Sequence, residues 1–135
     1  LGSTFIVGGQ IKDQPPELYL VYPQGNYIRP ADSKPYLVIG EVKYGKPILD
    51  RVITPKVSIG DASRCALISM DSTLKSDLTV GPPIDFAVIK KDEIKIASLK
   101  CLNMDDPEFS KVCSQWSQGI FKIFDSFQRF DWEQN

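Results

Sequence analysis

The order of its strand-like and helix-like segments constrains this chain most. Four short segments rich in β-branched and aromatic residues come first, at 4–7, 17–22, 26–29 and 36–39. Two helical patterns follow, then strand-like segments at 84–89 and 94–102, and then a last helical pattern. Strands and helices that come in separate runs predict an α+β fold, with antiparallel sheets flanked by helices. The 135 residues contain no internal repeat or linker, so we expect a single domain over residues 1–135.

The boundaries of the first segments follow from turn-forming residues. Pro23-Gln24-Gly25 is short enough to join 17–22 and 26–29 as a hairpin. The segment at 36–39, YLVI, is apolar on both faces, which predicts a central strand. It runs into Gly40-Glu41, which we expect to form the corner between this strand and a helix with Pro47 near its start.

The remaining helices carry recognisable start signals. Ser58, followed by Asp61, is a typical N-cap, and Asp106 is expected to cap the last helix. The second helix presents a narrow face of small residues suited to close packing, namely Ala62, Cys65, Ala66 and Ser69. We expect residues 71–73 to be its exposed end. In the last helix, Gly119 costs about 1 kcal/mol relative to alanine unless close packing requires it.

Charge argues against two classes of partner. The net charge is −1, and the basic residues are scattered along the chain. We therefore expect neither nucleic acid nor a membrane surface as the main partner. No apolar run approaches the roughly 20 residues of a membrane-spanning helix, and the first ten residues do not resemble a signal peptide.

Residue types that are rare or missing exclude several kinds of active site. The sequence has no histidine, which excludes Ser-His-Asp triads, Cys-His pairs and histidine-ligated zinc within this chain. The three cysteines are widely spaced, with no C-x-x-C pair. We expect reduced cysteines in a cytoplasmic protein, with no metal and no cofactor.

Two segments hold residues suited to chemistry. The Gly40-Glu41 corner could present backbone amides to an anion, or glycine could simply relieve crowding in a tight turn. The loop 75–81 gathers a lysine, an aspartate, two hydroxyls and a glycine, a set able to orient proton transfer. The same residues are also favoured where a helix ends. A third group, the aromatic residues between 121 and 132, either forms a docking surface or fastens the terminal helix.

Several motifs together resemble the proteasome β-subunit family. In that family a G-Y-D segment is followed by P-x-L-Y, by D-P-x-G, and by a strand that ends in G-S-G before a helix. The corresponding segments here are 8–11, 16–19, 23–25 and 39–41, with Tyr22 in place of the aspartate of D-P-x-G. More narrowly, IGEVKYGKPILDRVI and DSTLKSDLTVGPPIDFAVI resemble the bacterial proteasome-like branch called Anbu. The resemblance extends from about residue 4 to at least residue 95.

The resemblance implies an N-terminal nucleophile hydrolase, with two stacked antiparallel sheets between layers of helices. Active members use a first-residue threonine as nucleophile and its α-amine as base. That threonine, its partner aspartate and its lysine lie in the first half of such subunits. We therefore expect this chain to be the C-terminal part of a longer threonine peptidase, inactive alone, with Leu1 carrying the terminal amine and neither Ser3 nor Thr4 acting as nucleophile. The implied partners are its own N-terminal half, further copies in a ring or spiral, and a peptide or amide substrate.

Site residues can be carried over by position. Asp77 falls where the family's R-D-x-x-S-G-G loop has its aspartate, which orients the nucleophile's amine and hydroxyl. Val80 then stands in place of the motif serine and Gly81 matches the following glycine, while Thr79 is placed to supply the lost hydroxyl. Glu41 stands where the family has the serine of G-S-G. These substitutions leave open whether the branch is proteolytically active.

Two other interpretations remain. The first is a non-catalytic module for oligomerisation or protein binding, and the second is an unrelated α+β domain with the same spacing by coincidence. The upstream sequence separates the first alternative from the peptidase: a processed threonine followed by the family's aspartate and lysine favours the peptidase.

Overall fold

The computed structural model describes residues 2–93 and 95–134. Within this part of the chain the strands and helices follow one another as β1 (Phe5–Gly9), β2 (Glu17–Val21), β3 (Tyr27–Ile28), α1 (Lys46–Val52), α2 (Ile59–Ser76), β4 (Ile84–Ile89), β5 (Ile96–Leu102) and α3 (Pro107–Asp125), with a final 3₁₀ turn at Asp131–Gln134. The expected α+β class is therefore confirmed. The start of the strand expected at 94, and Leu1 with its terminal amine, lie outside the described residues.

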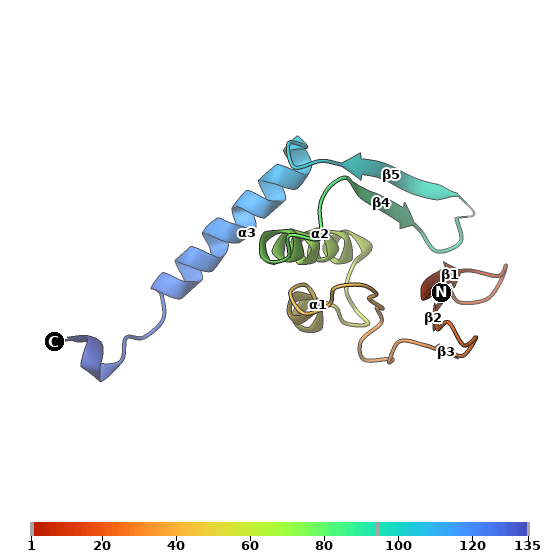
Figure 1. The fold of residues 1–135 in the computed structure, drawn as a ribbon, viewed down its shortest axis with the longest axis horizontal. Coiled ribbons are helices and arrows are strands. Elements are labelled where there is room, and N and C mark those ends of the chain that lie inside the picture. The colour runs from red at the N-terminus through yellow and green to blue at the C-terminus, as the bar shows by residue number, and fades with distance from the viewer. Residues whose placement is uncertain (1, 94, 135) are drawn as a thin grey trace.

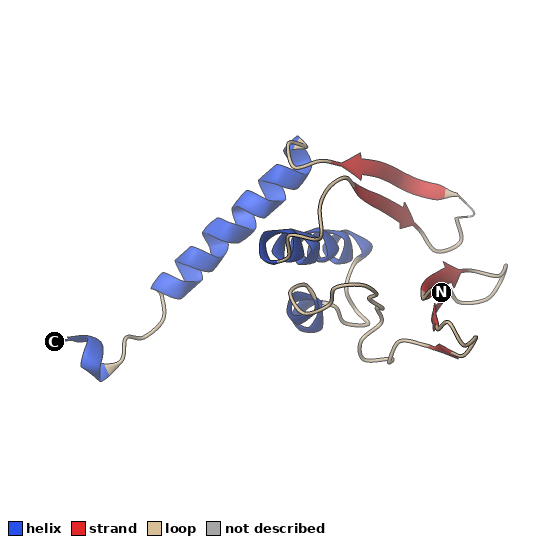
Figure 2. Cartoon of the chain, in the orientation of Figure 1, coloured by secondary structure: helices blue, strands red, loops and turns tan. Residues whose placement is uncertain are grey.

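The strands form two separate antiparallel sheets. One has the order β1-β2-β3, and the other is the hairpin of β4 and β5. The turn predicted at residues 23–25 is present: Gly25 has a φ of +87° and donates its N–H to the carbonyl of Tyr22. The sheets lie toward one side of the molecule and the helices toward the other (Figure 2).

The strand predicted at 36–39 is wrong. This segment has no ladder partner among the described residues, and the only bridge nearby joins Ala31 and Lys34. Tyr36 and Val38 instead pack against the apolar cluster of α1 and α2, while Ile39 is 43% exposed. The apolar pattern correctly indicated that Tyr36 and Val38 pack against other apolar side chains, but not that Ile39 is exposed. A strand also needs a neighbouring backbone, which composition cannot reveal.

Two small cores hold the elements together. Leu49, Ile53 and Cys65 form the first, between α1 and α2. The second consists of Leu102, Phe109 and Cys113, against which side chains from α2 and β4 pack. Helix α2 therefore contributes to both cores, and in Figure 1 it lies between α1 and the β4–β5 hairpin.

The helix starts agree with the sequence better than the helix ends. The Ser58 hydroxyl accepts from the backbone N–H of Asp61, and the Asp106 carboxylate accepts from the N–H groups of Glu108 and Phe109. Residues 71–73 are not an exposed end, because α2 continues to Ser76 and both Asp71 and Thr73 are buried. The expectation failed because of tertiary contacts: α3 packs on α2, and Gly45 at the start of α1 lies against Thr73.

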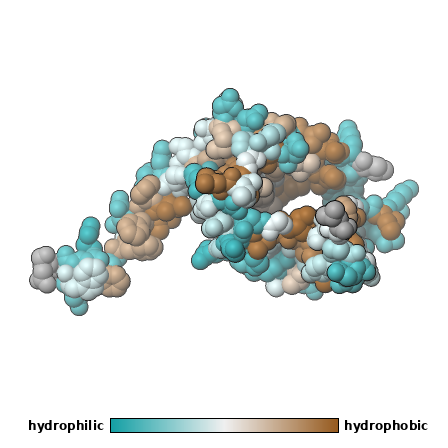
Figure 3. Space-filling view, viewed as in Figure 1, coloured by the Kyte–Doolittle hydropathy of each residue, from teal (hydrophilic) through white to brown (hydrophobic). Residues whose placement is uncertain are grey.

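Many large apolar side chains are exposed to solvent. All five residues of β1 are exposed, and beyond Gly119 helix α3 carries exposed isoleucines and phenylalanines. This half of α3 extends away from the rest of the molecule (Figure 1), and apolar side chains continue along it and over the strands (Figure 3). The described part of the chain contains no helix long and apolar enough to cross a membrane.

Candidate functional site

The corner at Gly40 exists, although it joins different elements from those expected. Gly40 has a φ of +79°, a left-handed conformation that glycine adopts without steric cost. Helix α1 begins only at Lys46, six residues later, after a turn. The half-buried Glu41 closes this turn, since its Oε1 accepts from the backbone N–H of Lys43 at 2.8 Å. With only seven helical residues, α1 offers little dipole to an anion.

Close packing brings Gly45, at the start of α1, against α2. A Cβ atom built on Gly45 would lie 2.3 Å from Ser69 Oγ and 3.1 Å from Thr73 Oγ1. Only a glycine therefore allows the chain to approach α2 at this point. The contact confirms that Ser69, on the face of small residues, serves close packing.

Asp77 and Thr79 are brought together in the loop after α2. Asp77 is the C-cap residue, and its N–H donates to the carbonyl of Thr73 at 2.9 Å. Its Oδ1 accepts from the hydroxyl of Thr79 at 2.7 Å and from the backbone N–H of Thr79 at 2.8 Å. This is an Asx turn, a typical arrangement for aspartate two residues before its partner.

Electrostatics keep Asp77 ionised. The hydroxyl of Thr79 lowers the pKa of the Asp77 carboxyl below its ordinary value, and the Thr79 amide and the charge of Lys43 act in the same direction. Lys43 therefore couples the corner to this loop electrostatically. A carboxylate with a lowered pKa is a poor proton acceptor at neutral pH but a good partner for an ammonium group.

The predicted site residues are thus only partly assembled. Asp77 and Thr79 are in direct contact, while the Glu41 carboxylate is engaged within its own turn. Val80 is half-buried, and no atom lies within 4 Å of a Cβ built on Gly81. Sequence reasoning missed Lys43, although its position two residues after Glu41 in the same turn was a usable signal.

Lys75 was grouped with this loop from the sequence and belongs elsewhere. It lies within α2 and pairs with the buried Asp71 at 2.8 Å. Its ammonium group also donates to Ser117 of α3. The set able to orient a proton or an amine is therefore smaller than the sequence predicted.

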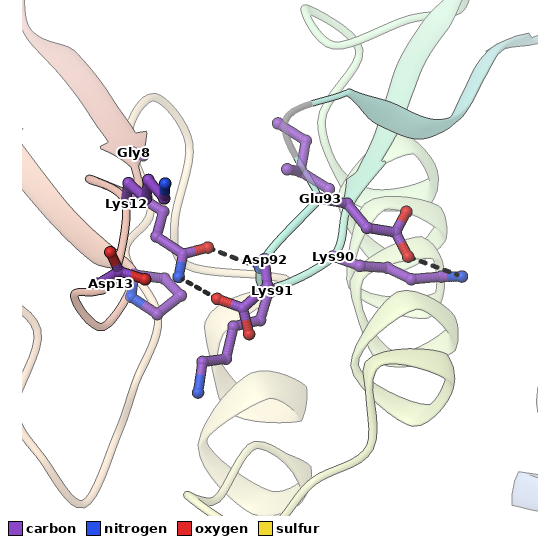
Figure 4. Close-up of a pocket in the computed structure, with 11 residues that line it drawn as sticks. Gly8, Lys12, Asp13, Lys90, Lys91, Asp92 and Glu93 are labelled. Atoms are coloured by element: carbon purple, nitrogen blue, oxygen red, sulfur yellow. Dashed lines mark hydrogen bonds and ion pairs between the residues drawn. The ribbon is translucent and has the colours of Figure 1, made fainter.

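A separate open cavity of about 890 Å³ lies between the β1–β2 connection and the β4–β5 hairpin (Figure 4). Gln10 and Asp92 span it with two reciprocal hydrogen bonds of 2.7 Å each, joining the two sheets. Its lining does not include Glu41, Asp77 or Thr79. The cavity is therefore a space between the two sheets, away from the candidate site.

Comparison with known proteins gives this geometry a context. Residues 1–89 match the family described as proteasome subunit. The chain belongs to the proteasome subunit family. No curated protein matches the sequence significantly.

Solved structures narrow the relationship to Anbu, the "ancestral beta-subunit". A Gly-1 mutant of Anbu from Hyphomicrobium sp. strain MC1 is 42% identical, with a TM-score of 0.91 over 96% of this chain and 55% of that one. The "Helical Assembly of the Anbu Complex" from Pseudomonas aeruginosa is 42% identical, with a TM-score of 0.91 over 100% of this chain and 56% of that one. Anbu from Yersinia bercovieri is 40% identical, with a TM-score of 0.89 over 93% and 54%.

The matches show the fold of this chain and how much of the relatives' length it covers. The sheets and helices described above have the proteasome-type arrangement of the Anbu structures. The chain spans little more than half the length of these relatives. The candidate residues thus lie on an N-terminal nucleophile hydrolase fold of the Anbu type.

Proposed function

We propose that this chain is the C-terminal part of a proteasome-type threonine peptidase, and that it positions a nucleophile which it does not itself contain. The observation that carries the proposal is the close structural match to Anbu, which covers nearly all of this chain and 55% of the relative. The remaining length supplies the first-residue threonine, with its aspartate and lysine. On this proposal the chain alone hydrolyses nothing.

The threonine's own α-amine acts as the general base. An unperturbed α-amine titrates at about 7.7–8.0, so it can accept the hydroxyl proton near neutral pH without a histidine. Asp77 orients this amine once it becomes an ammonium group. Both hydrogen bonds from Thr79 go to Oδ1 of Asp77, which leaves Oδ2 for the amine.

Thr79 and Glu41 have supporting roles in this proposal. The Thr79 hydroxyl takes the place of the motif serine and holds the Asp77 carboxylate in one orientation. Glu41 replaces the corner serine and accepts a hydrogen bond or a proton beneath the threonine. Lys43 adds positive charge, which keeps Asp77 ionised.

The proposed partners are the N-terminal part of the subunit and further copies of the subunit. The uncovered faces of β1 and α3 supply apolar surface for both. The helical assembly of the Pseudomonas relative supports a ring or spiral of subunits here. The substrate would be a peptide or amide hydrolysed in the cytoplasm, and neither nucleic acid nor a membrane takes part.

A second candidate is a non-catalytic module for oligomerisation or protein binding. Two departures from the family pattern favour it: Glu41 and Val80 stand where active members have serines. A branch that has lost these hydroxyls could keep the assembly surface and lose the chemistry.

One experiment separates the two candidates. The native full-length gene product is purified, its mature N-terminus is sequenced and its intact mass measured, and hydrolysis of a peptide library is followed. The peptidase requires an N-terminal threonine and turnover that falls at least a hundredfold in Asp77→Asn, while the control Asp105→Asn retains it. A mature chain without an N-terminal nucleophile, or a full-length protein without turnover, would leave the binding module. Turnover that survives Asp77→Asn would reject the role proposed for Asp77.

A further inference from the structure

The segment 36–46, which carries the Gly40-Glu41 corner, is held in place by side chains and not by a sheet. It has no ladder partner among the described residues. Its apolar contacts with the first core, made by Tyr36 and Val38, come before the corner. A loop that pairs with no strand needs other contacts to keep one conformation, because ordering its backbone costs entropy.

Asp50 of α1 binds both ends of this segment. Its Oδ1 accepts from the hydroxyl of Tyr36, the first residue, and its Oδ2 accepts from Nζ of Lys46, the last residue, at 2.7 Å. The ammonium group of Lys34, just before the segment, also donates to the backbone carbonyl of Asp50. The two oxygens of one carboxylate thus close the base of the loop that contains the corner.

These contacts form a network and not a single surface ion pair. The exposed pair of Lys46 and Asp50 would contribute little alone. Tyr36 is half-buried, and Nζ of Lys46 lies 6.0 Å from the centre of its ring, so the two donors lie side by side. The Lys46 ammonium group and then the Tyr36 hydroxyl lower the pKa of Asp50, so its carboxylate stays charged at neutral pH. Each hydrogen bond therefore helps to hold the other in place.

The last part of the segment lies against the helix that leads to Asp77. Gly45 is buried, and a Cβ built on it would lie 3.1 Å from Oγ1 of Thr73. The carbonyl of Thr73 accepts from the backbone N–H of Asp77 at 2.9 Å. The segment that Asp50 closes is thus connected to Asp77 through one residue, and the charge of Lys43, within the segment, acts on Asp77 as well.

We propose that Asp50 is a positioning residue for the candidate site. Its carboxylate fixes segment 36–46 against α2, and thereby sets where the corner lies relative to Asp77. Asp50 acts only through Tyr36 and Lys46 and has no part in the chemistry itself. The inference rests on the proposed function, since it concerns the placement of groups in that site.

Hydrogen exchange of the native full-length gene product tests whether Asp50 holds the segment. Two amides inside the segment report on its order: the N–H of Lys43 donates to the carboxylate of Glu41, and the N–H of Lys46 donates to the carbonyl of Val42. Asp50→Ala should speed the exchange of both about fivefold, the effect of losing one hydrogen bond. Alanine favours helix, so the substitution does not weaken α1 itself.

Two tyrosine substitutions refine this test. Tyr36→Phe removes one donor to Asp50 and keeps the ring, so it should act in the same direction as Asp50→Ala. Tyr44→Phe is the matched control, because Tyr44 lies in the same segment but is not one of the donors to Asp50. The amides of 109–113, in the second core, should keep their exchange rates in every variant. Unchanged exchange at the two reporter amides, or acceleration that includes the second core, would reject a local role for Asp50.

A titration tests whether the segment reaches the site. Lys43→Met removes a positive charge and should raise the pKa of Asp77, measured by carbon-13 NMR of its carboxyl. In Asp50→Ala the same substitution should raise this pKa less, because the released segment no longer keeps the ammonium group in place. A general loss of stability would not change this coupling between two residues. Equal shifts with and without Asp50, or no shift in either case, would overturn the proposal.

Hydrolysis of a cleaved peptide separates failure of this inference from failure of the proposed function. Asp50→Ala should lower kcat about fivefold and leave KM unchanged, because the group it positions acts on the reaction and not on substrate binding. Tyr44→Phe should leave both constants unchanged. A gene product without turnover would reject the peptidase, while exchange and titration would still decide the role of Asp50. Turnover that is unchanged in Asp50→Ala would reject the positioning role alone.

Discussion

The structure explains why the Asp77 carboxyl stays ionised. Two hydrogen bonds from Thr79 and the charge of Lys43 all favour its charged form. Its pKa in the folded protein therefore lies below the ordinary value of 3.8. A lowered pKa means that this stabilisation is present above about pH 3.8 and is lost as the pH falls through the folded pKa.

We predict that Thr79→Val raises the pKa of Asp77 toward 3.8 without reaching it. The Thr79 hydroxyl is the largest cause of the shift, while the backbone N–H and Lys43 remain in the variant. Carbon-13 NMR of the Asp77 carboxyl during a pH titration measures this directly. Ser76→Ala, one residue earlier, is the matched control and should leave the titration unchanged. An equal pKa in wild type and Thr79→Val would refute the assigned cause.

The sequence could predict contacts between neighbouring residues, but not contacts with distant parts of the chain. The Asp77–Thr79 contact spans two residues, so the residue types suffice to suggest it. Asp71 was placed at an exposed helix end because aspartate is seldom fully buried. Its burial depends on Lys75 and on α3, which begins more than thirty residues later. No local pattern carries that information.

At the scale of elements, two glycines should respond in opposite ways to the same substitution. Gly45→Ala places a methyl group against Ser69 and Thr73, so it should destabilise the protein by about 1–3 kcal/mol. Gly119→Ala meets no atom within 4 Å, and it should stabilise α3 by about 1 kcal/mol. Urea unfolding followed by circular dichroism measures both. Equal effects at the two sites would contradict the packing of α1 on α2.

Substitutions in the two halves of α3 should change the free energy of unfolding by different amounts. Phe109 is 1% exposed in the second core, so Phe109→Ala should lower the free energy of unfolding by about 3–5 kcal/mol. Phe124→Ala, on the same helix but 70% exposed, should change it by less than about 0.5 kcal/mol. Fluorescence-monitored urea unfolding, extrapolated to low protein concentration, compares them. A large cost at Phe124 that does not change with protein concentration would mean that the distal half of α3 packs within its own chain.

The sequence predicted where helices begin more readily than it predicted which elements pack against each other. The caps at Ser58 and Asp106 rely on bonds within three residues, and both were predicted. The segment at 36–39 was assigned to a sheet because apolar residues on both faces suggested two neighbours. In the structure its neighbours are the side chains of α1 and α2. An apolar pattern thus indicates that a segment packs against other apolar side chains, without showing which elements supply them.

The whole molecule has regular helices and strands but only small apolar cores. Its cores hold three buried apolar residues each, while many large apolar side chains remain accessible. Monomeric proteins rarely expose so much contiguous apolar surface. The chain spans little more than half the length of the Anbu structures, and under the proposed function the N-terminal part of the subunit covers these faces.

This chain on its own should therefore self-associate. We predict that sedimentation velocity detects species larger than a monomer, with an average mass that rises with protein concentration. Ammonium sulfate should strengthen the association, because it favours apolar burial, whereas salt would weaken contacts made by ion pairs.

Substitutions on α3 test whether its aromatic surface takes part. Phe121→Ser with Phe124→Ser should shift the distribution toward smaller species, because each removes a phenyl ring that is 70% exposed. The control pair Lys111→Ser with Gln118→Ser removes exposed polar side chains from the same helix and should leave the distribution unchanged. A monodisperse monomer at every concentration would mean that the exposed apolar faces do not drive association, and the case for a missing covering half would lose its physical basis.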